Sequence, residues 1–234
     1  MKILLTEPHP CSYLDDQEAR TGFVDPDIEV TPALYEALNQ LGFRRSGSHH
    51  YMPMCDQCRA CLPSRIPVQA FRPSRSQKRT IKRNQDLQVR VEAATFKAES
   101  YELYERYIDQ RHRDGDMFPA SEKQFRGFLV EGSKQCQHIE FRYANELIAV
   151  AVTDRLATGL SAIYTFFDPA YDWRSLGTQA ILTQLAIAKR MRLPYLYLGY
   201  YIEASPKMAY KGRFQPLEIL QDGEWHQIIT RSND

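Results

Sequence analysis

Three cysteines spaced two residues apart are the first feature of this 234-residue chain that could carry chemistry. Cys55, Cys58 and Cys61 can reach one metal ion or cluster from a single turn, and Cys11 could supply a fourth thiolate. Zinc and an iron–sulfur cluster both fit these ligands, and small buried side chains that happen to be cysteine are the alternative. A separate second pair, which a zinc ribbon needs, is missing, so the metal signal is incomplete.

A basic block at residues 72–90 has seven Lys and Arg side chains against one Asp. Five of them recur at helical spacing and therefore gather on one face of a helix: Arg75, Lys78, Arg79, Lys82 and Arg83. Such a face is either simply solvated or tracks the phosphates of a nucleic acid. The near absence of acidic residues favours phosphate binding, since a solvated helix usually mixes charges of both signs.

A polar loop and two strand ends hold the side chains that could move protons. The loop QRHRDGDM offers an imidazole and two carboxylates as bases, although a polar loop between helices is often only a loop. The strand ends carry phenols and acids, which can line a polar pocket, stack on a base or pack in the core. The candidate catalytic residues are His112, Asp116, Tyr164 and Asp168.

Residues 160–201 must position much of this chemistry, and their pattern predicts a strand, a helix and a parallel strand. The first strand spans 161–167, Ser175 can cap the helix, and the second strand spans 195–201. Ligands of such units bind at the strand C-termini, beside the N-terminus of the connecting helix. This places Arg174, Ser175 and Gly177 at the mouth of a site.

The mouth also resembles the pyrophosphate loop of acyl-CoA-dependent N-acetyltransferases. Arg174 and Gly177 match that loop, but Gln179 stands where a small residue would let the cofactor phosphates approach. We therefore expect the fold to be kept and the helix N-terminus to hold a different acyl donor.

The amino-acid composition indicates the general class of protein. The chain is 43% hydrophobic and 25% charged with a net charge of +1, which is ordinary for a globular protein. We find no apolar run of membrane-span length and no signal peptide, and we expect a cytoplasmic protein without disulfides. We predict a small cysteine-containing domain at residues 1–70 and a second domain at 71–234. Helices are predicted at 31–41, 99–113 and 121–129, and strands at 87–93, 138–143, 146–153, 218–220 and 225–229.

Several segments together resemble a known family. In order, they are CSYL, YMPMCDQCRACLPSRIPV, RPSRSQKRTIKRN, YIDQRHRDGDM, SAIYTFFDP, RSLGT, LPYLYLGYYI and KMAYKGRFQP. They resemble the bacterial branch of the arginyl-tRNA–protein transferase family, over nearly the whole chain. Eukaryotic members bind a metal or iron–sulfur cluster through cysteines that include a Cys-Gly-Tyr-Cys motif. Leu14 replaces the second cysteine of that motif here, so the ligand set is altered.

The resemblance implies an α+β fold with an N-acetyltransferase-like (GNAT) mixed-sheet domain beside the cysteine-containing domain. It implies transfer of leucine from leucyl-tRNA to the α-amine of proteins that begin with Asp or Glu, which marks them for degradation by the N-degron route. No cofactor is required by this reaction. The acceptor carboxylate needs a cation, and the candidates are Arg75, Arg79, Lys78 and Arg65. Candidates for donor and tRNA binding are Arg174, Ser175, Gly177, Lys82, Arg83, Tyr200 and Lys211.

Three alternatives stay open at this point: an arginyl donor, an acetyl-CoA-dependent N-acetyltransferase, and a non-catalytic module that binds tRNA or degrons. The altered loop at Gln179 and the basic helix speak against coenzyme A. The choice of leucine over arginine rests on the resemblance, because no pocket residue identified in the sequence decides it.

Overall fold

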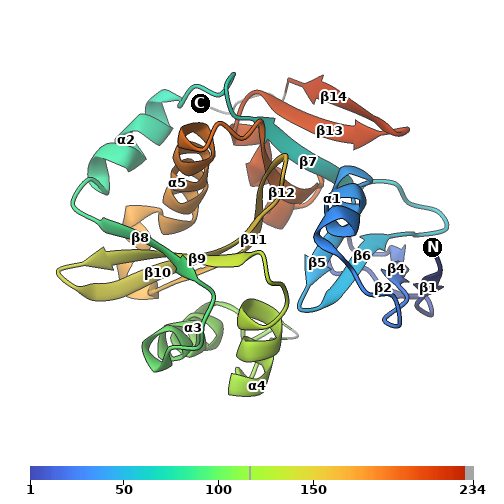
Figure 1. The fold of residues 1–234 in the computed structure, drawn as a ribbon, viewed down its shortest axis with the longest axis horizontal. Coiled ribbons are helices and arrows are strands. Elements are labelled where there is room, and N and C mark those ends of the chain that lie inside the picture. Colours follow the sequence, from blue (N-terminus) through green and yellow to red (C-terminus); the bar gives the residue numbers. More distant parts are fainter. Residues whose placement is uncertain (116, 230–234) are drawn as a thin grey trace.

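The computed structural model describes residues 1–115 and 117–229, which form a large sheet, a small sheet and a two-stranded ribbon (Figure 1). The strands of the large sheet are β7 (Leu62–Pro67), β8 (Gln88–Ala93), β9 (Cys136–Tyr143), β10 (Glu146–Arg155), β11 (Gly159–Phe167), β12 (Tyr195–Tyr201), β13 (Leu217–Gln221) and β14 (Glu224–Ile228). The small sheet holds β1 (Ile3–Leu5), β4 (Thr21–Val24), β5 (Arg44–Ser46) and β6 (His49–Pro53), and the ribbon holds β2 (His9–Pro10) and β3 (Glu18–Ala19).

The helices are α1 (Pro32–Gln40), α2 (Arg75–Arg83), α3 (Ala98–Arg111), α4 (Glu122–Phe125), α5 (Leu176–Arg190) and α6 (Pro206–Ala209), with shorter turns η1 (Arg126–Val130), η2 (Pro169–Arg174) and η3 (Tyr210–Arg213). Helix α5 packs on β10, β11 and β12, and α2 packs beside α5. Helices α3 and α4 lie on the other side of the large sheet (Figure 1). Among the described residues, no helix is long and apolar enough to cross a membrane.

The large sheet is mixed, in the order β14-β13-β7-β12-β11-β10-β9-β8. Its neighbouring strands run antiparallel except β11 and β12, which are parallel and joined through α5. This confirms the prediction of an α+β fold and of the strand–helix–strand unit. The central strand β10 is buried from Leu147 to Asp154, because helices cover both faces of the sheet there.

Two local predictions differ from the structure near the ends of elements. The predicted helix at 121–129 begins as α4 but widens into the π-type turn η1. Between β11 and α5 the chain forms the unpredicted turn η2, and it enters α5 through Ser175 with a left-handed φ of 55°. The Ser175 side chain therefore makes no capping hydrogen bond, although Ser175 occupies the N-cap position.

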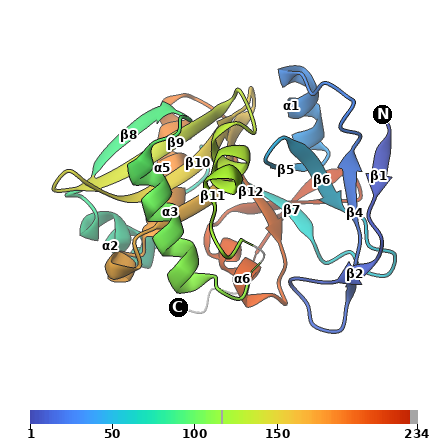
Figure 2. The ribbon, with the colours of Figure 1, turned by 90° about the horizontal axis from the view of Figure 1, so that it is seen from below.

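Strand β7 connects the two parts of the chain. It belongs to the segment 1–70, yet it lies inside the large sheet between β12 and β13 and pairs antiparallel with both. Figure 2 shows the small sheet and α1 standing beside the large sheet, with β7 reaching from one into the other. The N-terminal part is thus built into the sheet that carries the strand–helix–strand unit.

A buried ion pair joins the small sheet to the large one. Arg45 of β5 donates two hydrogen bonds to Asp154 of β10, at 2.6 and 2.8 Å, and both side chains are fully buried. The Tyr35 hydroxyl of α1 donates to the same carboxylate at 2.6 Å. Burial, and then the nearby Asp154 charge, raises the pKa of Tyr35. Since the carboxylate that neutralises Arg45 comes from the other sheet, the pair fixes how the two sheets meet.

Replacing Arg45 with Met is expected to destabilise the protein by about 3–5 kcal/mol, because it leaves the Asp154 carboxylate buried without its cation. Urea unfolding followed by circular dichroism measures this change. The matched control is Lys2→Met, which breaks a pair between the 71%-exposed Lys2 and Asp25 and should leave the unfolding midpoint nearly unchanged. Equal effects of the two variants would contradict the role given to the buried pair.

Candidate functional site

A gap between β11 and β12 is the centre of the candidate site. The two strands pair only where Gly159–Ser161 lies beside Tyr195–Tyr197, and beyond this point they separate. Each strand also bulges there, since the register of β11 with β10 shifts at Ile163 and that of β12 with β7 shifts at Leu198. Such bulges turn strands away from one another and are common beside functional sites.

Arg44 of β5 lies at this gap. Its guanidinium donates to the Ala162 carbonyl of β11 at 2.8 Å and to the Asn39 side chain at 3.3 Å. Gly199 of β12 adopts a left-handed φ of 79°, and a Cβ there would stand 3.5 Å from Nε of Arg44. Glycine adopts this left-handed φ without strain just after the bulge at Leu198, and the buried Arg44 places a positive charge beside both separated strands.

Lys211 brings a second buried cation to β12. Its ammonium donates to the carbonyl of Tyr200 and contacts the Met208 sulfur at 3.4 Å, and only 4% of the residue is exposed. Burial, and then the positive charge of Arg44, lowers the pKa of Lys211 to about 7. An amine with such a pKa exchanges protons readily near neutral pH.

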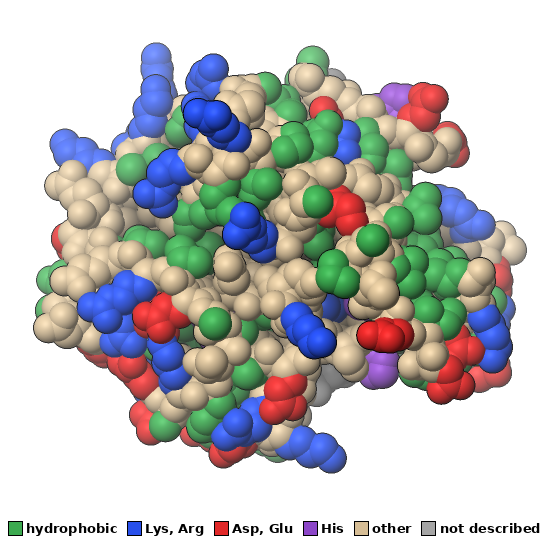
Figure 3. Space-filling view, viewed as in Figure 1, with side chains coloured by type: hydrophobic (Ala, Val, Ile, Leu, Met, Phe, Trp, Pro, Cys, Tyr) green, Lys and Arg blue, Asp and Glu red, His purple; other side chains and the backbone are tan. Residues whose placement is uncertain are grey.

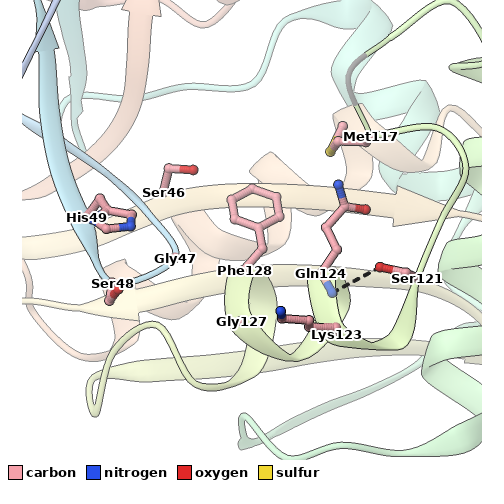
Figure 4. A pocket seen from close by; sticks show the side chains of 10 residues that line it. All are labelled: Ser46, Gly47, Ser48, His49, Met117, Ser121, Lys123, Gln124, Gly127 and Phe128. Atoms are coloured by element: carbon pink, nitrogen blue, oxygen red, sulfur yellow. Dashed lines mark hydrogen bonds between the residues drawn. The ribbon is translucent and has the colours of Figure 1, made fainter. Parts of the chain in front are cut away.

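An open pocket of about 560 Å³ lies between the β5–β6 turn and the α4–η1 segment (Figure 4). Gln124 of α4 and Phe128 of η1 line one side of it, and Ser46 and His49 of the small sheet line the other. Its lining residues are Ser46, Gly47, Ser48, His49, Met117, Ser121, Lys123, Gln124, Gly127 and Phe128. The pocket is therefore shared by the N-terminal and C-terminal parts of the chain.

Tyr164 links this pocket to β11. Its ring contacts that of Phe128, with 5.5 Å between centroids, and its buried hydroxyl has no hydrogen-bond partner among the described residues. Burial, and then the phenols of Tyr107 and Tyr104, raise the pKa of Tyr164, so the hydroxyl stays protonated and free to donate. The Tyr164 hydroxyl is thus a buried donor without an acceptor among the described residues.

The other candidate catalytic residues lie at different places. His112 ends α3, with its ring 5.0 Å from that of Tyr107, and burial followed by the charge of Arg111 lowers its pKa. Asp168 caps η2 by accepting from the Ala170 amide, and it pairs with Arg106 at 3.2 Å. Asp116 lies outside the described residues.

The predicted mouth at the start of α5 is arranged differently from the expectation. Arg174 is 3% exposed and pairs with both carboxylate oxygens of Asp86, at 2.8 and 2.9 Å. Its guanidinium is therefore engaged within the chain. Ser175 is exposed, and a Cβ at Gly177 would meet nothing within 4 Å, so this helix start is open.

Two predicted ligand-binding side chains of the large sheet are likewise engaged within the chain. Arg65 pairs with Glu218 at 2.7 Å and is stacked between the rings of Tyr195 and Trp225, at 3.6 and 4.1 Å. The Tyr200 hydroxyl lies 3.0 Å from the carbonyl of Gly42, to which it donates.

The basic side chains of α2 form a surface of their own, defined by Arg75, Lys78, Arg79, Lys82 and Arg83. All five are exposed, while Gln77, Thr80 and Asn84 point inward. None of the five pairs with a carboxylate of the described residues. Figure 3 shows Lys and Arg side chains gathered over the region where Figure 1 places α2. The five cations therefore all lie on the solvent side of α2.

The four predicted metal ligands do not form a metal site. Within residues 1–115 and 117–229, no three His, Cys, Asp or Glu side chains are grouped so as to hold a metal ion. Burial, and then the neighbouring Cys11, Cys55 and Cys58, raises the pKa of the Cys61 thiol to about 12. The expectation of zinc or an iron–sulfur cluster therefore finds no support in the described part of the chain.

Sequence reasoning missed Arg44, Arg45 and the pocket residues around Phe128. The available signal was the adjacent Arg44-Arg45 pair inside an extended segment, since two arginines on one strand point to opposite sides and meet different partners. The pocket itself had no local signal, because its two walls lie about seventy residues apart in the sequence.

Together, the mixed sheet with its strand gap, the shared pocket and the basic helix define an α+β protein whose two parts share a pocket. The chain belongs to the arginine-tRNA-protein transferase family: the N-terminal model of this family matches residues 9–79 and the C-terminal model matches residues 99–221.

Curated relatives match the chain over nearly their full length. The chain is 53% identical to a Hahella chejuensis protein over 95% of each chain, and 52% identical to a Teredinibacter turnerae protein over 99% of this chain and 96% of that one. Both relatives are named aspartate/glutamate leucyltransferase.

Solved structures resemble the chain only weakly. They include a lysylphosphatidylglycerol synthetase C-terminal domain from Agrobacterium fabrum, with a TM-score of 0.48 and 11% identity over 74% of this chain and 52% of that one. FemX has a TM-score of 0.46 and 9% identity over 77% of this chain and 63% of its own. Likeness at this level does not name the fold.

Replacing Arg44 with Gln is expected to raise the pKa of Lys211 above its value of about 7, because a neighbouring positive charge disfavours the ammonium form. A pH titration of ¹³C-labelled lysine signals by NMR measures this shift, with the Lys211 signal assigned by its loss in Lys211→Met. The matched control is Arg126→Gln on η1, which should leave the titration unchanged. An unaltered Lys211 midpoint in Arg44→Gln would contradict the coupling.

Proposed function

We propose that this protein transfers the leucyl group of leucyl-tRNA to the N-terminal α-amine of proteins that begin with Asp or Glu. The observation that carries the proposal is the identity of about half of all positions, over nearly full length, with relatives named aspartate/glutamate leucyltransferase. The product would carry an N-terminal leucine that marks it for degradation by the N-degron route.

The reaction asks little of an enzyme beyond positioning and proton transfer. The acceptor nitrogen attacks the ester carbonyl of the aminoacyl-tRNA, a C–N bond forms, and the C–O bond to the terminal ribose breaks. The proton leaves the attacking nitrogen, and the departing ribose oxygen takes one up. An α-amine has a pKa of about 8, so a fraction is already neutral at pH 7 and no protein nucleophile is required.

Lys211 supports this chemistry as a proton acceptor, because its pKa of about 7 leaves a substantial neutral fraction at physiological pH. Arg44 would add positive charge where the ester oxygen becomes negative. Tyr164, with its unpartnered hydroxyl, remains a candidate donor to that oxygen, and His112 a candidate base. Asp168 and Asp116 remain proposed catalytic residues. Asp168 also holds η2 by accepting a hydrogen bond from the Ala170 amide.

The surface of α2 supports contact with the RNA. Its five exposed cations, none of which pairs with a carboxylate of the described residues, can meet several phosphates of a nucleic acid along one helix. Lys82 and Arg83 keep their proposed role in tRNA binding. Ser175, Gly177, Tyr200 and Arg174 remain proposed for the donor, with Arg174 acting through its neighbours because its own guanidinium is paired.

Arg75, Lys78 and Arg79 remain proposed for binding the acceptor carboxylate, and we add Arg44 because it is a cation at the strand gap. Arg65 would have to exchange its pairing with Glu218 for the acceptor carboxylate. We further propose that the core is N-acetyltransferase-like, which the bulged and separated strands β11 and β12 support.

Residues 1–70 and 71–234 are our proposed domains, with β7 of the first domain lying inside the sheet of the second. A cytoplasmic location would bring the enzyme to its charged tRNA.

Incubation with radiolabelled leucyl-tRNA and peptides that begin with Asp, Glu or Ala tests the activity. Label is expected on the Asp and Glu peptides only, because the acceptor side chain must pair with a cation of the site. Lys211→Met should lower the rate of transfer at pH 7 by about 10²–10⁴-fold if it acts as the base. Labelled arginyl-tRNA and acetyl-CoA serve as control donors.

Labelling of the Asp peptide from arginyl-tRNA instead would contradict the leucyl donor, and labelling from acetyl-CoA would contradict the reaction class. Binding of tRNA with no transfer to any peptide would identify a non-catalytic module.

Charge reversal on α2 is expected to weaken tRNA binding and its salt dependence. Lys78→Glu should reduce the slope of log Kd against log salt concentration by about 1, because one phosphate contact is lost. The matched control is Lys134→Glu, which makes the same change at an exposed position before β9. Fluorescence anisotropy of labelled tRNA measures both, and equal slopes for the two variants would contradict a role for α2.

A further inference from the structure

Trp173 is a large apolar side chain that the fold leaves in solvent. It lies in η2, between the end of β11 and the start of α5, and 59% of it is exposed. No other large hydrophobic side chain of η2, α5 or β12 is exposed to solvent. Indole presents a broad aromatic face at little cost in conformational entropy, so its exposure at a fixed position suggests a ligand that stacks.

The Trp173 ring continues an existing stack. The Arg174 guanidinium carbon lies 4.6 Å from the centroid of the Trp173 ring and 4.4 Å from that of Tyr143. Asp86 holds this guanidinium through two hydrogen bonds, at 2.8 and 2.9 Å. The indole is thus backed by a fixed cation that is stacked in turn on a tyrosine.

The backbone that carries Trp173 is tied on both sides. The Arg83 side chain of α2 donates to the Trp173 carbonyl, and Asn84 donates to the Arg174 carbonyl at 2.9 Å. On the other side, Arg111 of α3 pairs with Asp172 at 2.8 Å. Because η2 is held before any ligand arrives, stacking on Trp173 would lose little freedom on binding.

The electrostatic surroundings of Trp173 suit a polyanion. Arg83, which holds its carbonyl, belongs to the basic surface of α2 together with Lys82 and Arg79. The neighbouring carboxylates, Asp172 and Asp86, are each paired with an arginine. An exposed aromatic ring beside a row of unpaired cations is the arrangement by which proteins hold unpaired nucleotides, with phosphates on the cations and a base on the ring.

We propose that Trp173 stacks on a base of the unpaired 3′ tail of the tRNA. The inference rests on the proposed function, since it takes aminoacyl-tRNA as the donor. Trp173 lies next to α2 through the contact with Arg83, and η2 follows directly on β11, the strand that borders the gap. α2 then holds the paired part of the RNA, and Trp173 sets the direction of its end.

Fluorescence tests the stacking directly, because the chain has two tryptophans. In a Trp225→Phe background, Trp173 is the sole indole, and stacking of a base should quench its emission. Titration with uncharged leucine tRNA is expected to quench this emission, whereas the same tRNA without its unpaired 3′ nucleotides should not. Equal quenching by the two RNAs, or quenching by neither while both bind, would overturn the proposal.

Binding constants provide the second measurement. Trp173→Ala should bind the tailed tRNA about 5- to 100-fold more weakly and Trp173→Phe by less, since phenylalanine keeps a stacking face. The slope of log Kd against log salt should stay at the wild-type value, because no charge is removed. Phe118→Ala, which removes a 41%-exposed aromatic ring after α3, is the matched control and should bind normally.

The outcomes separate this inference from the proposed function. Wild-type leucyl transfer with a Trp173→Ala variant that binds tailed tRNA within twofold of wild type would overturn the stacking alone. A raised KM for the acceptor peptide with unchanged tRNA binding would assign Trp173 to the protein substrate and also overturn it. No tRNA binding and no transfer by the wild-type protein would overturn both.

Discussion

The buried pair of Arg45 and Asp154 is the contact on which the arrangement of this protein depends. A fully buried charge is tolerated only with its partner, and these partners come from different sheets. The pair therefore specifies one relative position of the sheets more strictly than apolar packing would. The neighbouring Arg44 reaches the strand gap from the same strand, and the turn after β5 forms one wall of the pocket. The positions of Arg44 and of this pocket wall therefore depend on the contact between the two sheets.

Much of the fold follows from local signals. The tyrosine-rich segment 195–201 predicted β12 with its observed ends, and the helical spacing of basic and of apolar side chains predicted α2 and α5. What could not be predicted has long-range causes. The place of β7 inside the large sheet depends on partners more than a hundred residues away, and η2 is held by arginines of α2 and α3. Such partners leave no periodicity in the sequence.

The candidate site shows the same division. Residue types identified the basic helix and the tyrosine-rich strand, because charge and aromaticity are visible without a fold. They did not distinguish cations that meet solvent from those already paired: Arg174 and Arg65 look like ligand-binding residues in the sequence, yet each is satisfied by a carboxylate and by stacking. Conversely, Lys211 looks ordinary in the sequence, and burial next to Arg44 is what makes its amine unusual.

The position of β7 has a consequence for how the chain can be made. Its neighbours β12 and β13 follow it by more than a hundred residues, so the sheet cannot close while the C-terminal third is still on the ribosome. Until then β7 is an unpaired strand that the nascent chain must keep from other strands. The two parts matched by separate family models are therefore not interchangeable modules, and a recombination between them would have to preserve a strand that one part lends to the other.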